Sequence, residues 1–78
     1  MAAKQDIKPG TVYTVRGTEL ISPYPVRTDS ELEWSHGKVW VTEGFFLQPG
    51  NEWRDYGNSR QRISPVRLTE VNRQAVTN

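Results

Sequence analysis

Glycine and proline recur at short intervals along the whole sequence, and this spacing constrains the fold more than any other feature. A helix interior tolerates neither residue well, so no stretch is left that indicates a long helix. The intervening segments are short and rich in Val, Thr, Tyr, Phe and Trp, which favours strands joined by tight turns. The pattern therefore predicts an all-β protein, a small antiparallel barrel of five to six strands. The interrupting residues are Pro9-Gly10, Gly17, Pro23, Pro25, Gly37, Gly44, Pro49-Gly50, Gly57 and Pro65.

The chain has 78 residues, which is enough for one domain. A domain of this size buries roughly 60–65% of the surface that its unfolded chain exposes, so its core is thin. There is no cysteine, hence no disulfide and no cysteine-type zinc site. Stability must come from apolar packing, with homo-oligomerisation as a further source. We assign residues 6–73 to a single barrel domain and expect residues 1–5 and 74–78 to be flexible tails.

The N-terminal residues lack the apolar stretch of a secretory signal, because they include Lys4, Gln5 and Asp6. No apolar run approaches the roughly 20 residues that a membrane-spanning helix needs. The longest such run is Gly44-Phe45-Phe46-Leu47. These features predict a cytoplasmic protein without a membrane contact.

The segment WSHGKVW, residues 34–40, predicts a hairpin with a two-residue type I′ turn at His36-Gly37. Such a turn needs positive φ at both positions, which suits glycine and is acceptable for histidine. Because side chains alternate along a strand, Leu32, Trp34, Val39 and Val41 then share an apolar face, and Glu31, Glu33, Lys38 and Trp40 share the other. Trp34 is predicted in the core and Trp40 outside it. Burial of Trp40 under the loop 22–27 remains the alternative.

Before this hairpin, the first strand is predicted over Thr11 to Arg16. Glu19 to Ile21 either continues that strand or starts a second one. The segment Ser22-Pro23-Tyr24-Pro25 is predicted as an irregular loop or a sheet edge, because each proline removes a backbone donor from a central strand.

After the hairpin, Gln48-Pro49-Gly50-Asn51 has proline and glycine in the positions of a type II turn and should reverse the chain. A third reversal is predicted at Gly57-Asn58, where a leading glycine fits a type II′ turn. That register places Tyr56 opposite Ser59, Asp55 opposite Arg60, Arg54 opposite Gln61, and Trp53 opposite Arg62. It brings an acid against a base and an indole against a guanidinium.

Toward the C-terminus, a strand should end at Ile63, and Pro65 should open a single 3-10 turn. Val66 and Leu68 are then expected to close the core, with a final strand from Thr69 to Val71. This closing segment resembles that of SH3-like small barrels. The opening segment Lys8 to Val15 also resembles their first strand, including that of the KOW-type members.

The same family contains an enzyme of this size, the type II dihydrofolate reductase, whose closing segment is similar to Ile63 to Asn72. The Val-Gln-Ile-Tyr run that lines its active pore is absent, and Arg62-Ile63-Ser64 stands there. The resemblance therefore implies the barrel fold and not the reductase activity.

Residues suited to catalysis are sparse. The only histidine in the sequence, His36, is predicted at an exposed turn tip, where nothing in the sequence orients it as a base. Glu31 and Glu33 have a spacing that could hold a cation, although such pairs are usually solvated. We therefore expect no enzyme, no cofactor and no bound metal.

Charge is balanced overall but unevenly distributed along the sequence. The chain has ten Lys and Arg and nine Asp and Glu, for a net charge of +1. Five of the seven arginines lie between Arg54 and Arg73, whereas residues 29–33 carry three acids, so we expect a basic side and an acidic side. Arginine and aromatic side chains are enriched in protein interfaces and also bind nucleic acids. The candidate partner-binding residues are Trp40, Trp53, Arg54, Tyr56, Arg60, Arg62 and Arg67.

Two functions follow from this surface. The first is a small protein-binding module, an adaptor or stoichiometric inhibitor of the kind found among phage and mobile-element accessory proteins. The second is nucleic-acid binding by an SH3-like barrel through the face from Arg54 to Arg67. The near-zero net charge disfavours the second, because nucleic-acid affinity grows with the number of phosphates neutralised.

Overall fold

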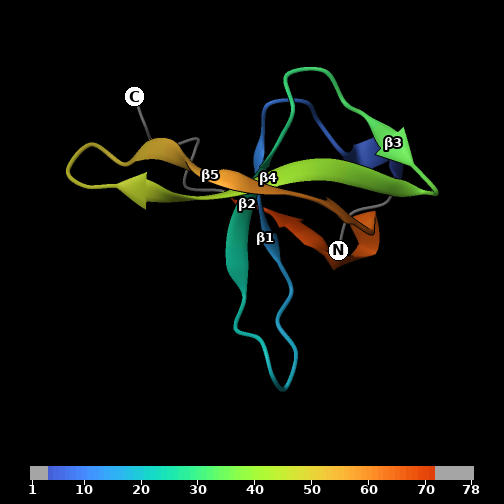
Figure 1. Ribbon diagram of the computed structural model, residues 1–78, viewed down its shortest axis with the longest axis horizontal. Helices are drawn as coiled ribbons and strands as arrows, with labels where there is room; N and C mark the ends of the chain where they lie inside the picture. Colours follow the sequence, from blue (N-terminus) through green and yellow to red (C-terminus); the bar gives the residue numbers. More distant parts are fainter. Residues whose placement is uncertain (1–3, 72–78) are drawn as a thin grey trace.

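The computed structural model describes residues 4–71, which form one curled antiparallel sheet (Figure 1). Strands β4, β2, β1 and β6 lie side by side in that order. The short strand β3 pairs with β4 along the same edge as β2, and β5 pairs with the other edge of β4. The sheet curls into a half-barrel, which confirms the predicted all-β class. The elements in chain order are η1 (Lys4–Asp6), β1 (Val12–Val15), β2 (Tyr24–Thr28), β3 (Trp34–Ser35), β4 (Lys38–Leu47), β5 (Glu52–Ile63), η2 (Pro65–Arg67) and β6 (Leu68–Glu70).

The core lies on the inner face of the curl. It is small, as expected for this chain length, and most of its side chains are branched aliphatics from alternate strand positions. Leu32 and Trp34 pack against it from the edge, together with Tyr24. The buried core residues are Ile7, Tyr13, Val15, Val26, Val39, Val41, Ile63 and Leu68.

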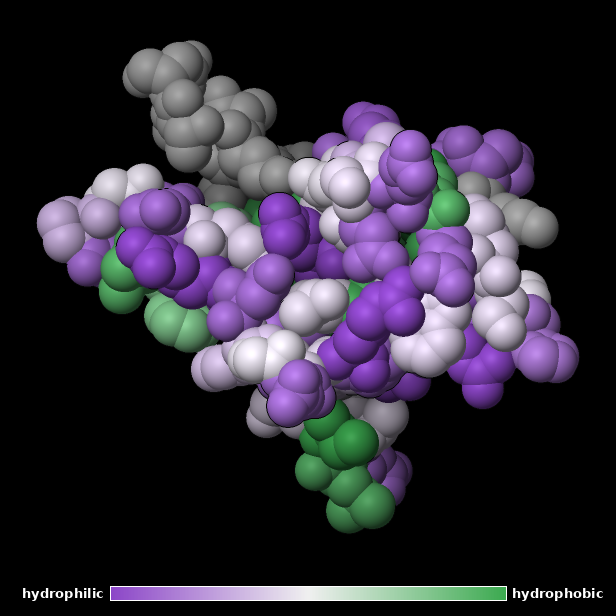
Figure 2. Space-filling model, turned by 45° about the horizontal axis from the view of Figure 1, so that its top comes forward, coloured by the Kyte–Doolittle hydropathy of each residue, from purple (hydrophilic) through white to green (hydrophobic). Residues whose placement is uncertain are grey.

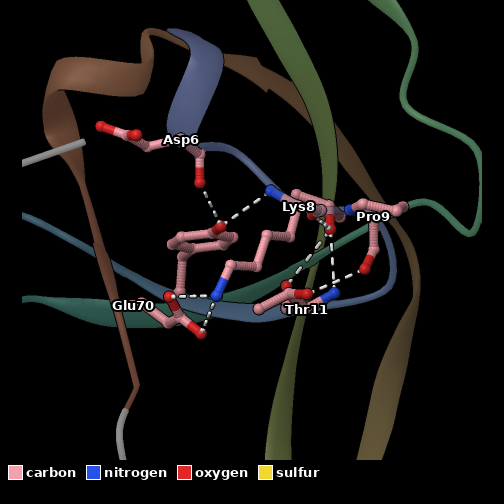
Figure 3. A network of polar contacts seen from close by, with 7 residues as sticks. Asp6, Lys8, Pro9, Thr11 and Glu70 are labelled. Atoms are coloured by element: carbon pink, nitrogen blue, oxygen red, sulfur yellow. Dashed lines mark hydrogen bonds and ion pairs between the residues drawn. The ribbon is translucent and has the colours of Figure 1, made fainter. Parts of the chain in front are cut away.

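Two buried hydroxyl groups fasten the N-terminal segment to this core (Figure 3). The Tyr13 hydroxyl accepts a hydrogen bond from the Lys8 backbone N–H at 2.9 Å and donates to the Asp6 carbonyl at 3.4 Å. The Thr28 hydroxyl donates to the Lys8 carbonyl at 2.7 Å and accepts from the Thr11 N–H at 2.9 Å. Because both hydroxyls are satisfied, their burial carries no desolvation penalty for an unpaired group.

The hairpin between β3 and β4 forms as the sequence predicts. Ser35 pairs with Lys38 and Trp34 with Val39, and the turn residues His36 and Gly37 have φ values of 56° and 74°. The Trp40 N–H donates to the Glu33 carbonyl at 3.0 Å, which continues the same register. Trp34 therefore contacts the core, and Trp40 lies half-buried on the outer face of the sheet.

The region between the first two strands differs from the prediction. Residues 19–21 form a bend and not a strand. Tyr24 and Pro25 belong to β2, which lies between β1 and β4 and is therefore central. Successive backbone N–H groups of β2 point alternately to β1 and to β4, and that of Thr28 points to β1. The nitrogen of Pro25 therefore faces β4, but pairing between β2 and β4 stops at Val26. Proline is tolerated because no hydrogen-bond donor is needed at that position.

The largest error of the sequence prediction concerns Gly57-Asn58. The chain does not reverse there; β5 runs from Glu52 to Ile63 and pairs with β4 along its length. Thr42 pairs with Arg60 and Gly44 with Asp55, so the four residues 56–59 bulge opposite the single residue Glu43. The Ser59 hydroxyl, which lies 3.0 Å from the Glu43 carbonyl oxygen, stabilises this bulge. The predicted pairs Asp55–Arg60 and Trp53–Arg62 are consequently wrong.

The other predicted reversals are present. The chain turns at residues 48–51, where Gly50 has a φ of 94° and the Gln48-Pro49 bond is cis. Pro65 opens η2, as expected, and the last strand begins one residue earlier than predicted. Leu68 is buried, but Val66 is 50% exposed and does not close the core, because η2 turns its side chain outward.

Within residues 4–71 no helix is long and apolar enough to cross a membrane. Of the predicted N-terminal tail, Lys4 and Gln5 belong to the single turn η1. The predicted tail at residues 74–78 lies outside the described residues.

Candidate interaction surfaces on the long hairpin

Strands β4 and β5 form a long hairpin that has two parts (Figure 1). The base, residues 38–42 with 60–63, belongs to the half-barrel and covers its core. The arm, residues 44–55, projects beyond the other strands and ends in the turn at residues 48–51. The bulge at residues 56–59 separates the two parts. Six of the seven predicted partner-binding residues lie on this hairpin, but on different surfaces.

On the outer face of the base, two arginines flank Trp40. Arg62 is its direct cross-strand partner, and Arg60 is opposite Thr42, one diagonal step away on the same face. The guanidinium carbons lie 4.4 Å (Arg60) and 5.6 Å (Arg62) from the indole centroid, within the range of cation–π attraction. The aliphatic stems of both arginines therefore lie beside Trp40, which explains its half-buried state on a solvent-facing surface.

Arg60 also binds two carboxylates. Its Nη2 lies 2.7 Å from Asp29 Oδ2 and 2.7 Å from Glu33 Oε1. The hydrogen bonds to Asp29 and then to Glu33 raise the pKa of the Arg60 guanidinium above its ordinary value. The acidic segment 29–33 thus folds against β5, and the expected separation into a basic side and an acidic side is wrong. On this face the positive charge of Arg60 is already compensated within the chain.

Arg62 contacts the tip of the neighbouring hairpin. Its Nη1 donates to Ser35 Oγ at 3.1 Å and to His36 Nδ1 at 3.0 Å. Because arginine has no acceptor, His36 Nδ1 must accept, and the neutral ring carries its proton on Nε2. Ser35 Oγ is 3.0 Å from the same nitrogen. These contacts hold His36 in its turn, although the residue is exposed.

The arm has an outer face that is continuous with that of the base. Trp53 packs edge-on against Phe46 with ring centroids 5.3 Å apart, and its indole N–H donates to Asp55. Asp55 in turn forms an ion pair with Arg27 of β2 at 3.0 Å. The indole lies across Gly44, where a Cβ atom would overlap Trp53 and the Arg54 carbonyl. Gly44 is therefore required for this packing of Trp53.

A shallow hollow of about 250 Å³ lies where the arm leaves the sheet. Phe46 borders it on the arm, and Thr14, Pro23, Tyr24, Pro25 and Val71 complete its lining. Of the described residues that line it, none carries a charged side chain.

The inner face of the arm is different, because no other strand of the described chain lies under it. Tyr56 stacks against Phe45 with centroids 5.2 Å apart, yet their exposed fractions are 48% and 36%. Leu47, on the same face as Phe45, is 40% exposed. Arg54 pairs with Phe45 across the strands and lies 3.6 Å from Glu52, an ion pair in which both side chains are more than half exposed. We call Phe45, Leu47 and Arg54 of the arm, together with Tyr56 of the adjoining bulge, the arm surface.

The structure therefore divides the predicted site. Trp40, Arg60 and Arg62 form one cluster at the base, Arg54 and Tyr56 contribute to the arm surface, and Trp53 holds the arm's outer face. Arg67 lies on η2, where its Nη2 donates to the Arg16 carbonyl at 3.3 Å, and it joins neither group.

Sequence reasoning missed Phe45 and Leu47. Their signal was present in the run Phe45-Phe46-Leu47, because alternation in a strand places the first and third residues on one face and the second on the other. An apolar run of this kind needs cover on both faces, and the described chain supplies little to the face of Phe45 and Leu47.

Among residues 4–71, no group of three His, Asp or Glu side chains is arranged to hold a metal ion. Glu33, which was considered with Glu31 as a cation site, forms an ion pair with Arg60.

Comparisons of the chain with protein-family models, with curated proteins and with solved structures gave no match. The arguments about function therefore start from the surfaces described above.

Proposed function

We propose that the protein is a small non-enzymatic protein-binding module that contacts its partner through the arm surface. The observation that carries this proposal is the exposure of Phe45, Leu47 and Tyr56 together on one projecting sheet face. A contiguous exposed apolar patch marks an interaction site more often than scattered single residues do. Tyrosine and arginine, both present here, are among the residues that contribute most to protein interfaces.

The form of β5 supports side-chain recognition over strand addition. Within the described residues β5 pairs on one side with β4, which leaves its second edge open. The bulge at residues 56–59 interrupts that edge. The strand also carries five charged side chains, which are Glu52, Arg54, Asp55, Arg60 and Arg62. Bulges and charges of this kind protect an edge against pairing with another strand. A partner would therefore bind the arm through Phe45, Leu47 and Tyr56.

The half-barrel is of the SH3-like kind in this proposal. The single 3-10 turn η2 before the final strand and the sharply curled antiparallel sheet support that assignment. An adaptor or inhibitor needs such a rigid scaffold, because loss of conformational freedom on binding weakens affinity.

Nucleic-acid binding through Arg54 to Arg67 has less support. Arg60 lies between Asp29 and Glu33, and Arg54 has Glu52 beside it. Arg67 is on a different part of the molecule. The arginines therefore do not combine into one uncompensated stripe, and few phosphates could be neutralised at once.

The test is affinity capture from the native host with the immobilised protein, followed by titration of the purified partner. We expect one dominant partner whose affinity falls by at least about tenfold in the Leu47→Ser, Tyr56→Ser double variant. Val66→Ser is the matched control, because Val66 has similar exposure but lies on η2.

An unchanged affinity of the arm variant would refute the arm as the contact surface. Tight, strongly salt-dependent binding of single- or double-stranded oligonucleotides, lost in an Arg60→Glu, Arg62→Glu variant that still folds, would establish the nucleic-acid alternative instead.

A further inference from the structure

The loop between β1 and β2 presents a second exposed apolar feature. Leu20 is 94% exposed and Ile21 is 52% exposed at its tip. Figure 2 shows hydrophobic atoms gathered on this loop, well apart from those along the lower edge of the arm. The two features project in different directions (Figure 1), so the loop of one molecule lies away from its own arm.

Hydrogen bonds of Thr18 hold the backbone of this loop. Thr18 Oγ1 accepts hydrogen bonds from the backbone N–H groups of Leu20 at 3.2 Å and Ile21 at 3.1 Å. The Thr18 N–H donates to the Ile21 carbonyl at 2.8 Å. Gly17 closes the loop, since a Cβ atom there would lie 2.8 Å from both the Ile21 carbonyl oxygen and Pro23 Cδ. One threonine thus fixes the backbone that presents both apolar side chains.

A turn prepared in this way loses little conformational freedom when it binds, which favours its use as an anchor. It offers a narrow apolar tip of two side chains, whereas the arm surface is a broad face with two aromatic rings. Charges next to the two features are opposite: Glu19 precedes Leu20 in the loop, and Arg54 is the cross-strand partner of Phe45 in the arm. The weak Arg54–Glu52 pair at 3.6 Å leaves Arg54 able to engage another carboxylate.

We propose that the Leu20-Ile21 loop of one molecule docks on the arm surface of a second copy of the chain, with Glu19 beside Arg54. This inference rests on the proposed role of the arm as a protein-binding surface and names its occupant. The contact is heterologous, so successive copies either close into a ring or continue as a chain. A contact between two arms would leave Leu20 in solvent and would bring Arg54 near its own symmetry copy.

The test is complementation between two variants, measured by sedimentation velocity. Wild-type protein should associate as its concentration rises. Leu20→Ser with Ile21→Ser should remove the anchor, and Phe45→Ser with Leu47→Ser should remove the surface. Each variant alone should be monomeric, with association at least about tenfold weaker. An equimolar mixture should form a heterodimer, because one intact loop and one intact arm remain. Val66→Ser should associate as the wild type does.

The charge pair provides a second readout. Glu19→Arg and Arg54→Glu should each weaken self-association, and the two changes in one chain should restore it. If circular dichroism shows that the Phe45→Ser, Leu47→Ser variant is unfolded, Leu47→Arg replaces it, because that side chain is exposed.

A wild-type protein that stays monomeric up to its solubility limit would overturn the proposal. So would a Leu20→Ser, Ile21→Ser variant that associates as strongly as the wild type, since that result indicates a contact that does not use the loop, such as one between two arms. Variants that are each monomeric but do not form the heterodimer would also overturn it. The proposal that the arm surface binds a partner would survive any of these outcomes if the affinity of a captured partner still fell on substitution of Leu47. The two proposals can therefore be refuted separately.

Discussion

The base and the arm of the β4–β5 hairpin consist of the same two strands but have opposite relations to solvent. At the base, the inner-face residues Val39, Val41 and Ile63 are buried under the curled sheet. In the arm, the inner-face residues Phe45 and Leu47 are larger and apolar, yet they remain exposed. Alternation along a strand assigns a residue to a face, but what lies opposite that face determines its burial.

The outer faces differ in the same way. At the base, Trp40 is flanked by arginines that bind side chains on a neighbouring segment. In the arm, Trp53 is held by contacts within the hairpin and by the single ion pair of Asp55 with Arg27. The base is therefore integrated into the domain on both faces, and the arm is integrated on one.

The largest expected effect is a difference in the free energy of unfolding between two variants, one at a buried and one at an exposed aliphatic residue of the hairpin. Ile63→Ala at the base should lower the free energy of unfolding by about 2–5 kcal/mol, because it leaves a cavity in the core. Leu47→Ala in the arm should change it by less than about 0.5 kcal/mol, since this side chain is exposed and lies outside the core. Urea unfolding measures both, and equal effects would show that the arm is also part of the core.

A smaller effect is expected at the junction of base and arm. Gly44→Ala should lower the free energy of unfolding by about 1–3 kcal/mol, because the added Cβ overlaps the Trp53 indole and the Arg54 carbonyl. The indole N–H resonance of Trp53 should shift as its ring is displaced. Gly57→Ala is the control: a Cβ there meets nothing within 4 Å, so stability should stay the same or rise slightly. Equal loss in both variants would contradict the packing of Trp53 across Gly44.

The smallest effect concerns Arg60. Arg60→Met keeps the aliphatic stem beside Trp40 and removes both carboxylate contacts, so thermal unfolding should shift down slightly and the shift should shrink in high salt. The raised pKa of Arg60 means that its contribution is present at every pH below the ordinary arginine range and is lost only above it. The shift should therefore show no titration by Arg60 between about pH 6 and about pH 9, because this range lies far below the ordinary pKa of arginine. A loss on raising the pH within this range would contradict that assignment.

Local features of the sequence predicted the β3–β4 hairpin correctly, because a His-Gly turn of two residues and the alternation around it allow one register that packs Leu32 and Trp34 against the core. The same kind of reasoning failed at Gly57. Glycine permits a reversal but does not require one, and pairing of β5 with β4 on both sides of the bulge uses the same residues in a longer strand. The opposed charges that seemed to support the reversal find partners elsewhere, Asp55 with Arg27 and Arg60 with Asp29 and Glu33.

The candidate site was likewise predictable only in part. Aromatic and arginine residues of the second half were predicted to bind a partner, and that function remains a prediction. Their distribution over separate surfaces could not be predicted, because it depends on which segments lie beside Trp40 and Trp53 in space. The exposed residues Leu20 and Ile21 were assigned to a strand, since an apolar pair between polar residues looks the same in a strand and at a loop tip.

The sequence by itself determined the all-β class, the turns at residues 36–37 and 48–51 and the 3-10 turn at Pro65, because each depends on the backbone preferences of a few adjacent residues. Tertiary structure alone decided that Pro25 lies in a central strand, that β5 continues past Gly57 and that the arm surface is left uncovered. These outcomes depend on which segments meet across the chain, and the free energy of such contacts belongs to both partners and not to either sequence alone.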